Sequence, residues 1–159
     1  MGTIAGSLHP TRMRDLLVFF HLAGAIFWMG GMGFMLLALR PAAGTLQPPD
    51  RLRLLSDVLR RFFWVVGLSI VVLLLTGAAL MAAAGGQGMP RGWHAMAGIG
   101  VVMVLLFAHI VAAPYRRLRG AVAASNWPEG ARRMGQIALF VRINFALGWI
   151  AILAVLVWR

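Results

Sequence analysis

Four long apolar stretches dominate this sequence of 159 residues. They are residues 16–39, 62–84, 93–113 and 137–158. The hydrocarbon core of a bilayer is about 30 Å thick, and an α-helix crosses it in roughly 20 residues. Hydrophobic residues make up 61% of the chain, more than a soluble domain of this length can bury. The sequence therefore predicts an all-α integral membrane protein, an up-and-down four-helix bundle that forms one domain over residues 1–159.

The charged residues lie mostly outside these stretches. All 15 basic residues are arginines, and four acidic residues oppose them, which gives a net charge of +11. Arginines cluster in the first connection, within residues 40–61, and in the third, within residues 116–133, whereas the second connection contains only Arg91. Basic residues accumulate in cytoplasmic loops. We therefore predict that the first and third connections face the cytoplasm and that both termini lie outside.

Several classes of function are excluded or disfavoured by composition. A nucleic-acid role would need a soluble basic module, and no part of the chain is long enough to form one, so anionic lipid head groups are the predicted partners of the arginines. The chain has no cysteine, which excludes thiolate metal sites and cysteine nucleophiles. No hydrolytic or nucleotide-binding motif is present. Whether the protein is an enzyme stays open, and a haem-dependent oxidoreductase is the enzyme class that these residues allow.

Three histidines lie within the apolar stretches, where ligating side chains are costly and mark candidate sites. His21 lies in the outer half of the first stretch, His94 begins the third, and His109 lies near the other end of the third. The first and third helices of an up-and-down bundle run in the same direction. His21 and His94 are therefore expected at a similar depth, where they could face each other across the bundle.

One candidate site is a haem b held by His21 and His94 as axial ligands. Small residues such as Gly24 and Gly98 would leave room for the porphyrin ring.

Two further features extend this haem hypothesis. His109 and Met35 are spaced to form a second pair at the opposite depth, and the alternative for His109 is an interfacial histidine. Arg142 could anchor a haem propionate, or simply extend to the interface as arginines near helix ends do.

The other candidate is a copper site centred on His21, with His94 as partner. Imidazole and thioether groups suit Cu(I) in a chain without thiolates. Trp28, Met32 and Met35 follow His21 at helical spacing and are predicted to share its inward face. Methionine is also a common gap-filler in apolar packing, so this pattern alone does not establish a site.

In both cases the first and third helices carry the predicted function, and the second and fourth are predicted to be scaffold. A third possibility is a non-catalytic assembly partner of a larger membrane complex, in which the histidines only bridge helices.

Several segments resemble the copper resistance D (CopD) family over most of residues 16–150. They are HLAGAIFWMGGMGFMLLALRPA, RRFFWVVGLSIVVLLLTGAAL, HIVAAPYRRLRGAVAASNWPEGARRMGQI and RINFALG. The resemblance implies copper handling in a bacterial inner membrane. In that membrane the arginine distribution predicts periplasmic termini. The expected partners are further copies of the chain, since four helices are few for a pore, or a periplasmic copper or redox partner. The pattern of His21 and Trp28 more distantly resembles the four-helix haem-binding protoporphyrinogen oxidase family, which implies haem b at His21.

Overall fold

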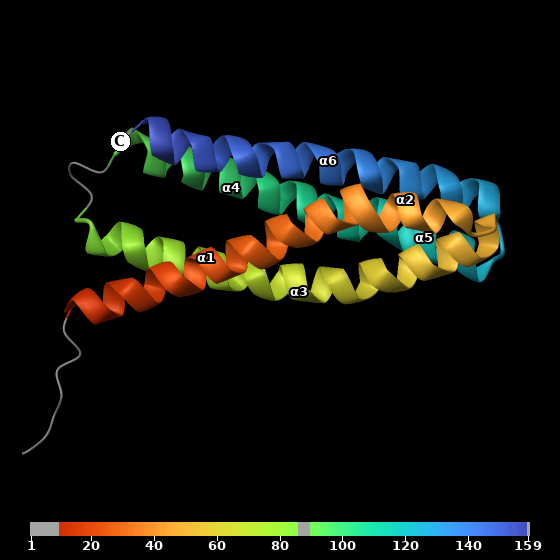
Figure 1. The fold of residues 1–159 in the computed structure, drawn as a ribbon, viewed down its shortest axis with the longest axis horizontal. Coiled ribbons are helices and arrows are strands. Elements are labelled where there is room, and N and C mark those ends of the chain that lie inside the picture. Colours follow the sequence, from red (N-terminus) through yellow and green to blue (C-terminus); the bar gives the residue numbers. More distant parts are fainter. Residues whose placement is uncertain (1–9, 86–89, 159) are drawn as a thin grey trace, which may run out of the picture.

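The computed structural model describes residues 10–85 and 90–158, and nearly all of them are helical (Figure 1). In chain order the elements are α1 (Pro10–Phe34), the π-helical turn η1 (Met35–Leu39), α2 (Arg40–Ala42), the 3₁₀ turn η2 (Ala43–Thr45), α3 (Pro48–Ala83), α4 (Arg91–Ile110), the π-helical turn η3 (Val111–Tyr115), α5 (Arg116–Ala123) and α6 (Trp127–Val157). They join into four helical segments, each long and apolar enough to cross a membrane. The predicted all-α four-helix membrane bundle is confirmed.

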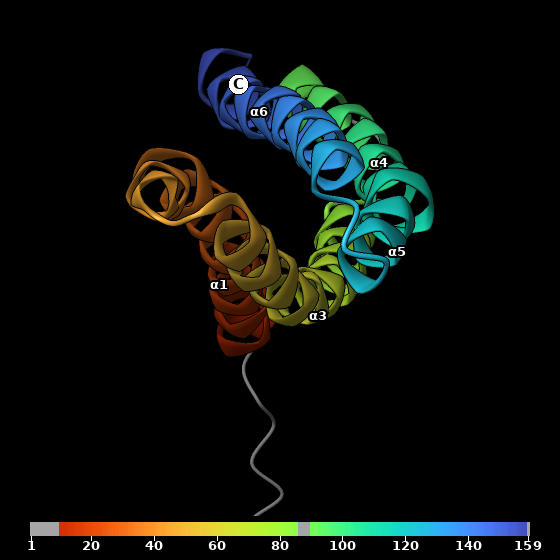
Figure 2. The ribbon, with the colours of Figure 1, turned by 90° about the vertical axis from the view of Figure 1, so that its right-hand side faces the viewer.

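Consecutive segments run in opposite directions (Figure 1). The start of α1 and the end of α6 lie at the same end of the bundle as the end of α3 and the start of α4, and we call this the terminal end. The first and third connections lie at the opposite end, which we call the arginine-rich end. Helix α1 packs mainly on α3, and α4 mainly on α6. Figure 2, viewed from the arginine-rich end, shows these two pairs facing each other.

The helices extend beyond the apolar stretches. At two prolines the chain stays helical because a π-helical turn lies at the proline or just before it. The third helix was expected to end at residue 113, but η3 carries the chain through Pro114 into α5. Proline has no N–H, and its ring collides with the carbonyl one turn earlier. A π-helical turn is wider and can accommodate that collision. Pro41 follows η1 in the same way, so the first segment also continues past its apolar stretch.

The lipid-facing surface is as apolar as the interior. Trp64 is 80% exposed and Leu37 is 76% exposed, although both lie within the helical segments. Such side chains would be unfavourable in contact with water and are favourable in contact with acyl chains. Fully buried apolar side chains form the core between the helices, among them Leu52, Leu59, Val66, Ile110, Leu118 and Ile137. The chain is therefore a multi-pass membrane protein.

Candidate metal site

His21 is held by a hydrogen bond between helices. Its Nδ1 lies 2.9 Å from Oγ1 of Thr76 on α3. Gly77, the next residue on α3, lies against the imidazole, since a Cβ there would be 3.3 Å from Cε1 of His21. The sequence Thr76-Gly77 thus supplies both a hydroxyl and the space for the ring. His21 is half-buried between α1 and α3.

The geometry of Thr76 determines which ring nitrogen of His21 carries the proton. The Thr76 hydroxyl donates to the carbonyl oxygen of Val72, at 2.7 Å. Its single hydrogen is therefore used, and Oγ1 can only accept from His21. Nδ1 of His21 is then protonated, and Nε2 keeps its lone pair. Histidines that bind metals are oriented in this way, with one nitrogen donating to the protein and the other free for the ligand bond.

The side-chain ends of two methionines, from different helices, pack against one glycine of α6. The thioether of Met29 on α1 occupies the space that a Cβ on Gly148 would need. That Cβ position is also 3.3 Å from the terminal methyl of Met103 on α4. Because position 148 is a glycine, three helices approach closely here and two thioethers lie together inside the bundle. We call Met29, Met103 and Gly148 the methionine cluster.

Asn144 adds a polar group beside this cluster. It lies on α6 one turn before Gly148, and only 2% of its surface is exposed. Its Nδ2 donates to the carbonyl oxygen of Met103, at 3.3 Å. Its Oδ1 is buried with no hydrogen-bond partner among the described residues. An unsatisfied buried carbonyl is destabilising by about 1–3 kcal/mol, so it calls for an explanation.

Further methionines continue from the cluster toward the arginine-rich end. Met32 is 2% exposed and Met35 is 6% exposed, both on the first segment. Met35 and Met134 of α6 line a cavity of about 20 Å³ between α6, α3 and the first helical segment. The predicted inward direction of Met32 and Met35 agrees with this burial. Trp28, also predicted on this face, is buried with its ring edge toward Phe107, the two centroids 6.4 Å apart.

The other predicted ligands lie elsewhere. His94 is exposed in the first turn of α4. His109 is also exposed, with its ring edge-to-face on Phe140 at a centroid distance of 5.1 Å. Arg142 is exposed on α6. Among residues 10–85 and 90–158, no hydrogen bond or ring contact joins His21 to His94, and none joins His109 to Met35.

The two glycines expected to leave room for a haem lie in different surroundings. Gly24, expected to leave room for a porphyrin, instead permits close packing, since a Cβ there would be 3.2 Å from Leu73 Cγ and 3.3 Å from the carbonyl oxygen of Ser69. Gly98 is exposed, with open space around it. The described residues thus do not form the expected bis-histidine haem site within one chain. No group of three or more His, Asp or Glu side chains suited to a metal ion occurs among them either.

Sequence reasoning missed Thr76, Asn144 and Gly148, which lie on helices expected to be scaffold. Thr76 and Asn144 are polar side chains in otherwise apolar stretches. By the argument used for the histidines, they are also candidate site residues.

A family model described as copper resistance protein D matches residues 56–158, more than half of the chain. The match covers Thr76, Met103, Asn144 and Gly148, and begins after α1 has ended. The resemblance to the haem-binding protoporphyrinogen oxidase family gains no support from this comparison. No curated protein and no solved structure matches the chain.

Proposed function

This chain belongs to the copper resistance protein D family, and we propose that it conducts copper as Cu(I) along methionine side chains inside the bundle. The observation that most directly supports the proposal is the convergence of Met29 and Met103 against Gly148, beside the unpaired Oδ1 of Asn144. Copper is here the cargo, and no catalytic step is required.

The chemistry of the cluster suits a soft monovalent cation. Thioethers bind Cu(I) in preference to the hard cations Mg²⁺ and Ca²⁺. They are neutral and lose little hydration on burial, so an apolar interior can hold them without a compensating charge. The Asn144 carbonyl oxygen carries a partial negative charge one turn from Gly148, and its lone pairs have no partner among the described residues. A cation beside it would satisfy that oxygen.

The remaining methionines extend the cluster into a path. Met32 and Met35 lie three and six residues beyond Met29, which corresponds to about 4.5 and 9 Å along the helix axis. Met35 and Met134 then border a small cavity toward the arginine-rich end. Steps of this length let Cu(I) pass from one thioether group to the next without entering lipid.

His21 is the proposed first ligand at the terminal end. It lies eight residues before Met29, about 12 Å along α1, and its free Nε2 is oriented through Thr76. Since the termini are predicted to be periplasmic, a periplasmic copper or redox partner would deliver Cu(I) here. His94 has no role in this path, because its side chain is exposed on α4.

Copper titration of the purified full-length protein tests the proposal. Under anaerobic conditions, the wild type should remove Cu(I) from a chromogenic chelator and hold it against dialysis. Met29→Leu combined with Met103→Leu replaces both thioethers by side chains of similar volume, so the fold should survive. This variant should lose most of the bound copper.

The matched control changes two methionines outside the cluster. Met13→Leu with Met96→Leu removes the same number of thioethers, from the exposed start of α1 and from a half-buried site on α4. The control should bind as much copper as the wild type. Equal copper loss in both double variants, or no loss in either, would contradict the proposed cluster. An absorption band of b-type haem in the purified protein would instead favour the haem hypothesis.

A further inference from the structure

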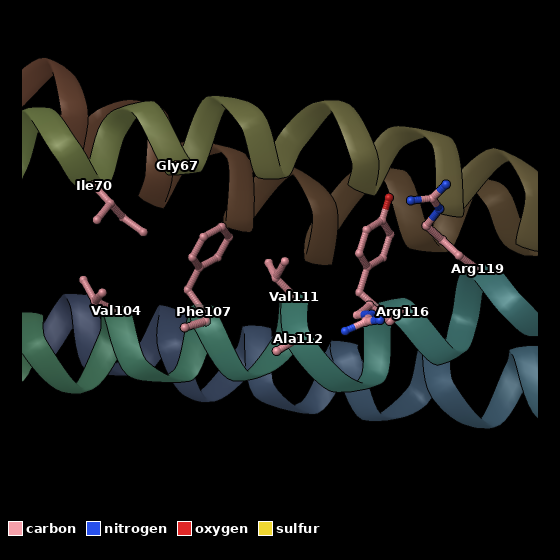
Figure 3. A pocket seen from close by; sticks show the side chains of 10 residues that line it. Gly67, Ile70, Val104, Phe107, Val111, Ala112, Arg116 and Arg119 are labelled. Atoms are coloured by element: carbon pink, nitrogen blue, oxygen red, sulfur yellow. The ribbon is translucent and has the colours of Figure 1, made fainter.

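A groove opens on the side of the bundle between α3 and α4, away from the methionine cluster. Its volume is about 660 Å³, and it is lined by Gly67, Ile70, Val104, Phe107, Ala108, Val111, Ala112, Tyr115, Arg116 and Arg119. Figure 3 shows Ile70 and Val104 at one end of the groove and Arg116 and Arg119 at the other. The groove is thus apolar over most of its length and cationic at one end.

The dimensions of the groove match one leaflet of a bilayer. Val104 and Arg119 are 15 residues apart on α4, η3 and α5, which corresponds to about 22 Å along the helix. A bilayer with its head groups is about 40–45 Å thick, so half of it is of the same size. With Arg119 at the arginine-rich end, the apolar part of the groove lies at the depth of acyl chains and the two arginines at the depth of head groups.

The acidic side chains near the arginines of the groove are paired with other arginines. At the arginine-rich end, Asp50, Asp57 and Glu129 pair with arginines of their own helices. No ion pair of Arg116 or Arg119 is found in the part of the chain that the structure describes. Two unneutralised guanidinium groups at the end of an apolar groove complement a phosphate attached to an acyl chain.

Tyr115 forms part of the groove wall at the same end. Its ring packs edge-to-face on Phe63, at a centroid distance of 4.9 Å, so the side chain is fixed. Its hydroxyl is buried and is therefore not exposed to a ligand in the groove. Tyr115 thus shapes the cationic end of the groove, and Arg116 and Arg119 supply the contacts to a phosphate.

We propose that this groove binds one anionic phospholipid from the leaflet at the arginine-rich end, independently of copper. The phosphate lies between Arg116 and Arg119, and an acyl chain follows the groove past Val111 and Phe107 toward Gly67. A second copy of the chain is the poorer occupant, because each copy carries a net charge of +11 and would bring further arginines to the same depth.

Native mass spectrometry of the full-length protein in a neutral detergent tests the site. Phosphatidylglycerol and phosphatidylcholine with identical acyl chains are the probes. The wild type should retain one phosphatidylglycerol with roughly 25-fold preference, since each arginine near an anionic head group contributes about a factor of five. Arg116→Gln with Arg119→Gln should abolish the preference. The control Arg61→Gln with Arg117→Gln removes the same charge from exposed positions outside the groove and should keep it.

A second variant tests the apolar part of the groove. Gly67→Leu places a side chain into open space, because no atom lies within 4 Å of a Cβ there. It should fill the groove and reduce retention of phosphatidylglycerol several-fold, whereas Gly98→Leu, at an open position outside the groove, should not. Unchanged retention in Arg116→Gln with Arg119→Gln, or equal retention of the two lipids by the wild type, would overturn the proposal. So would a shift from dimer to monomer in Gly67→Leu with lipid retention unchanged, which would identify a second copy as the occupant.

Discussion

The thioether of Met29 on α1 occupies the space that a β-carbon at position 148 of α6 would need. Gly148→Ala should therefore displace the Met29 thioether, whose flexible side chain can move while both helices keep their positions. Overpacking against a movable side chain should destabilise the protein by no more than about 1–3 kcal/mol. Thermal unfolding in detergent should show a slightly lower midpoint, and copper titration should show a clear loss of bound Cu(I).

Gly135→Ala is the matched control for this change. It lies on the same helix, and no atom lies within 4 Å of its Cβ position. Alanine favours a helix over glycine by up to about 1 kcal/mol, so this variant should be as stable as the wild type or more stable. If Gly148→Ala behaves like Gly135→Ala in both measurements, the close approach of α1 and α6 at this point is wrong.

Gly92 joins α4 to the end of α6. Its N–H donates to the carbonyl oxygen of Trp158 at 2.9 Å, and a Cβ on Gly92 would lie 2.9 Å from Cα of Val155. In Gly92→Ala the obstacle is backbone, which cannot rotate away as a side chain can. We expect a lower thermal midpoint, whereas Gly98→Ala, in open space on α4, should leave it unchanged or raise it. A midpoint of Gly92→Ala equal to that of the wild type would rule out this packing.

The bond between His21 and Thr76 should contribute both to stability and to copper affinity. Thr76→Val keeps the shape of the side chain and removes the acceptor. Hydrogen bonds between membrane helices are worth about 0.6 kcal/mol on average, and losing the partner that orients a metal-binding histidine reduces metal affinity about 10–100-fold. A double-mutant cycle of Thr76→Val with His21→Leu should give a non-zero coupling in both measurements.

Ser69→Ala is the control for Thr76→Val. Ser69 is buried on the same helix, but its hydroxyl donates only to Val65 within α3. Its loss should leave Cu(I) binding unchanged. Additive effects of Thr76→Val and His21→Leu on copper binding would show that Thr76 does not orient the imidazole for the metal.

A substitution of Asn144 should affect Cu(I) affinity and thermal stability differently. Asn144→Leu removes a buried oxygen that has no partner among the described residues, but it also removes the donor to the Met103 carbonyl oxygen. The first change is stabilising and the second is destabilising, each by about 1 kcal/mol. The thermal midpoint should therefore change little, while Cu(I) affinity falls because the Asn144 carbonyl oxygen is gone. A large drop in the midpoint with copper binding retained would assign Asn144 a structural role only.

The control for Asn144 is another asparagine of the same chain. Asn126 caps α6, its Oδ1 accepting from the N–H of Glu129 at 3.2 Å. Asn126→Ala should destabilise the protein by about 1 kcal/mol, as the loss of an N-cap usually does. It should leave copper binding intact, because the cap lies at the arginine-rich end.

The number of helices was predictable from the sequence, but their lengths and partners were not. Apolar stretches mark where helices must cross lipid, whereas helix ends in polar regions depend on local geometry. The turn η3 illustrates this, since the third apolar stretch ends at residue 113 and the helical structure continues through Pro114. Partners are likewise undetermined by hydropathy, because every face of these helices is apolar and the sequence pattern alone does not select a neighbour.

For His21, the sequence predicted the position of the residue but not its hydrogen-bond partner. Its position in the membrane and its half-burial follow from the sequence, because a histidine in an apolar helix needs a polar partner. The predicted partner was His94 on a parallel helix, yet the hydrogen bond goes to Thr76 on the neighbouring antiparallel helix. A short antiparallel connection places consecutive helices side by side, and that makes Thr76 the nearer partner.

The sequence by itself determined that this chain lies in a membrane, that it is all-helical, and that its ligating atoms are imidazole and thioether groups. These conclusions follow from transfer free energies and side-chain chemistry, which do not depend on the fold. Only the tertiary structure decided that Met29 and Met103 end against Gly148, with Asn144 beside them. That arrangement depends on which glycines let three helices approach each other, and close packing between residues distant in the chain is a property of the assembled bundle.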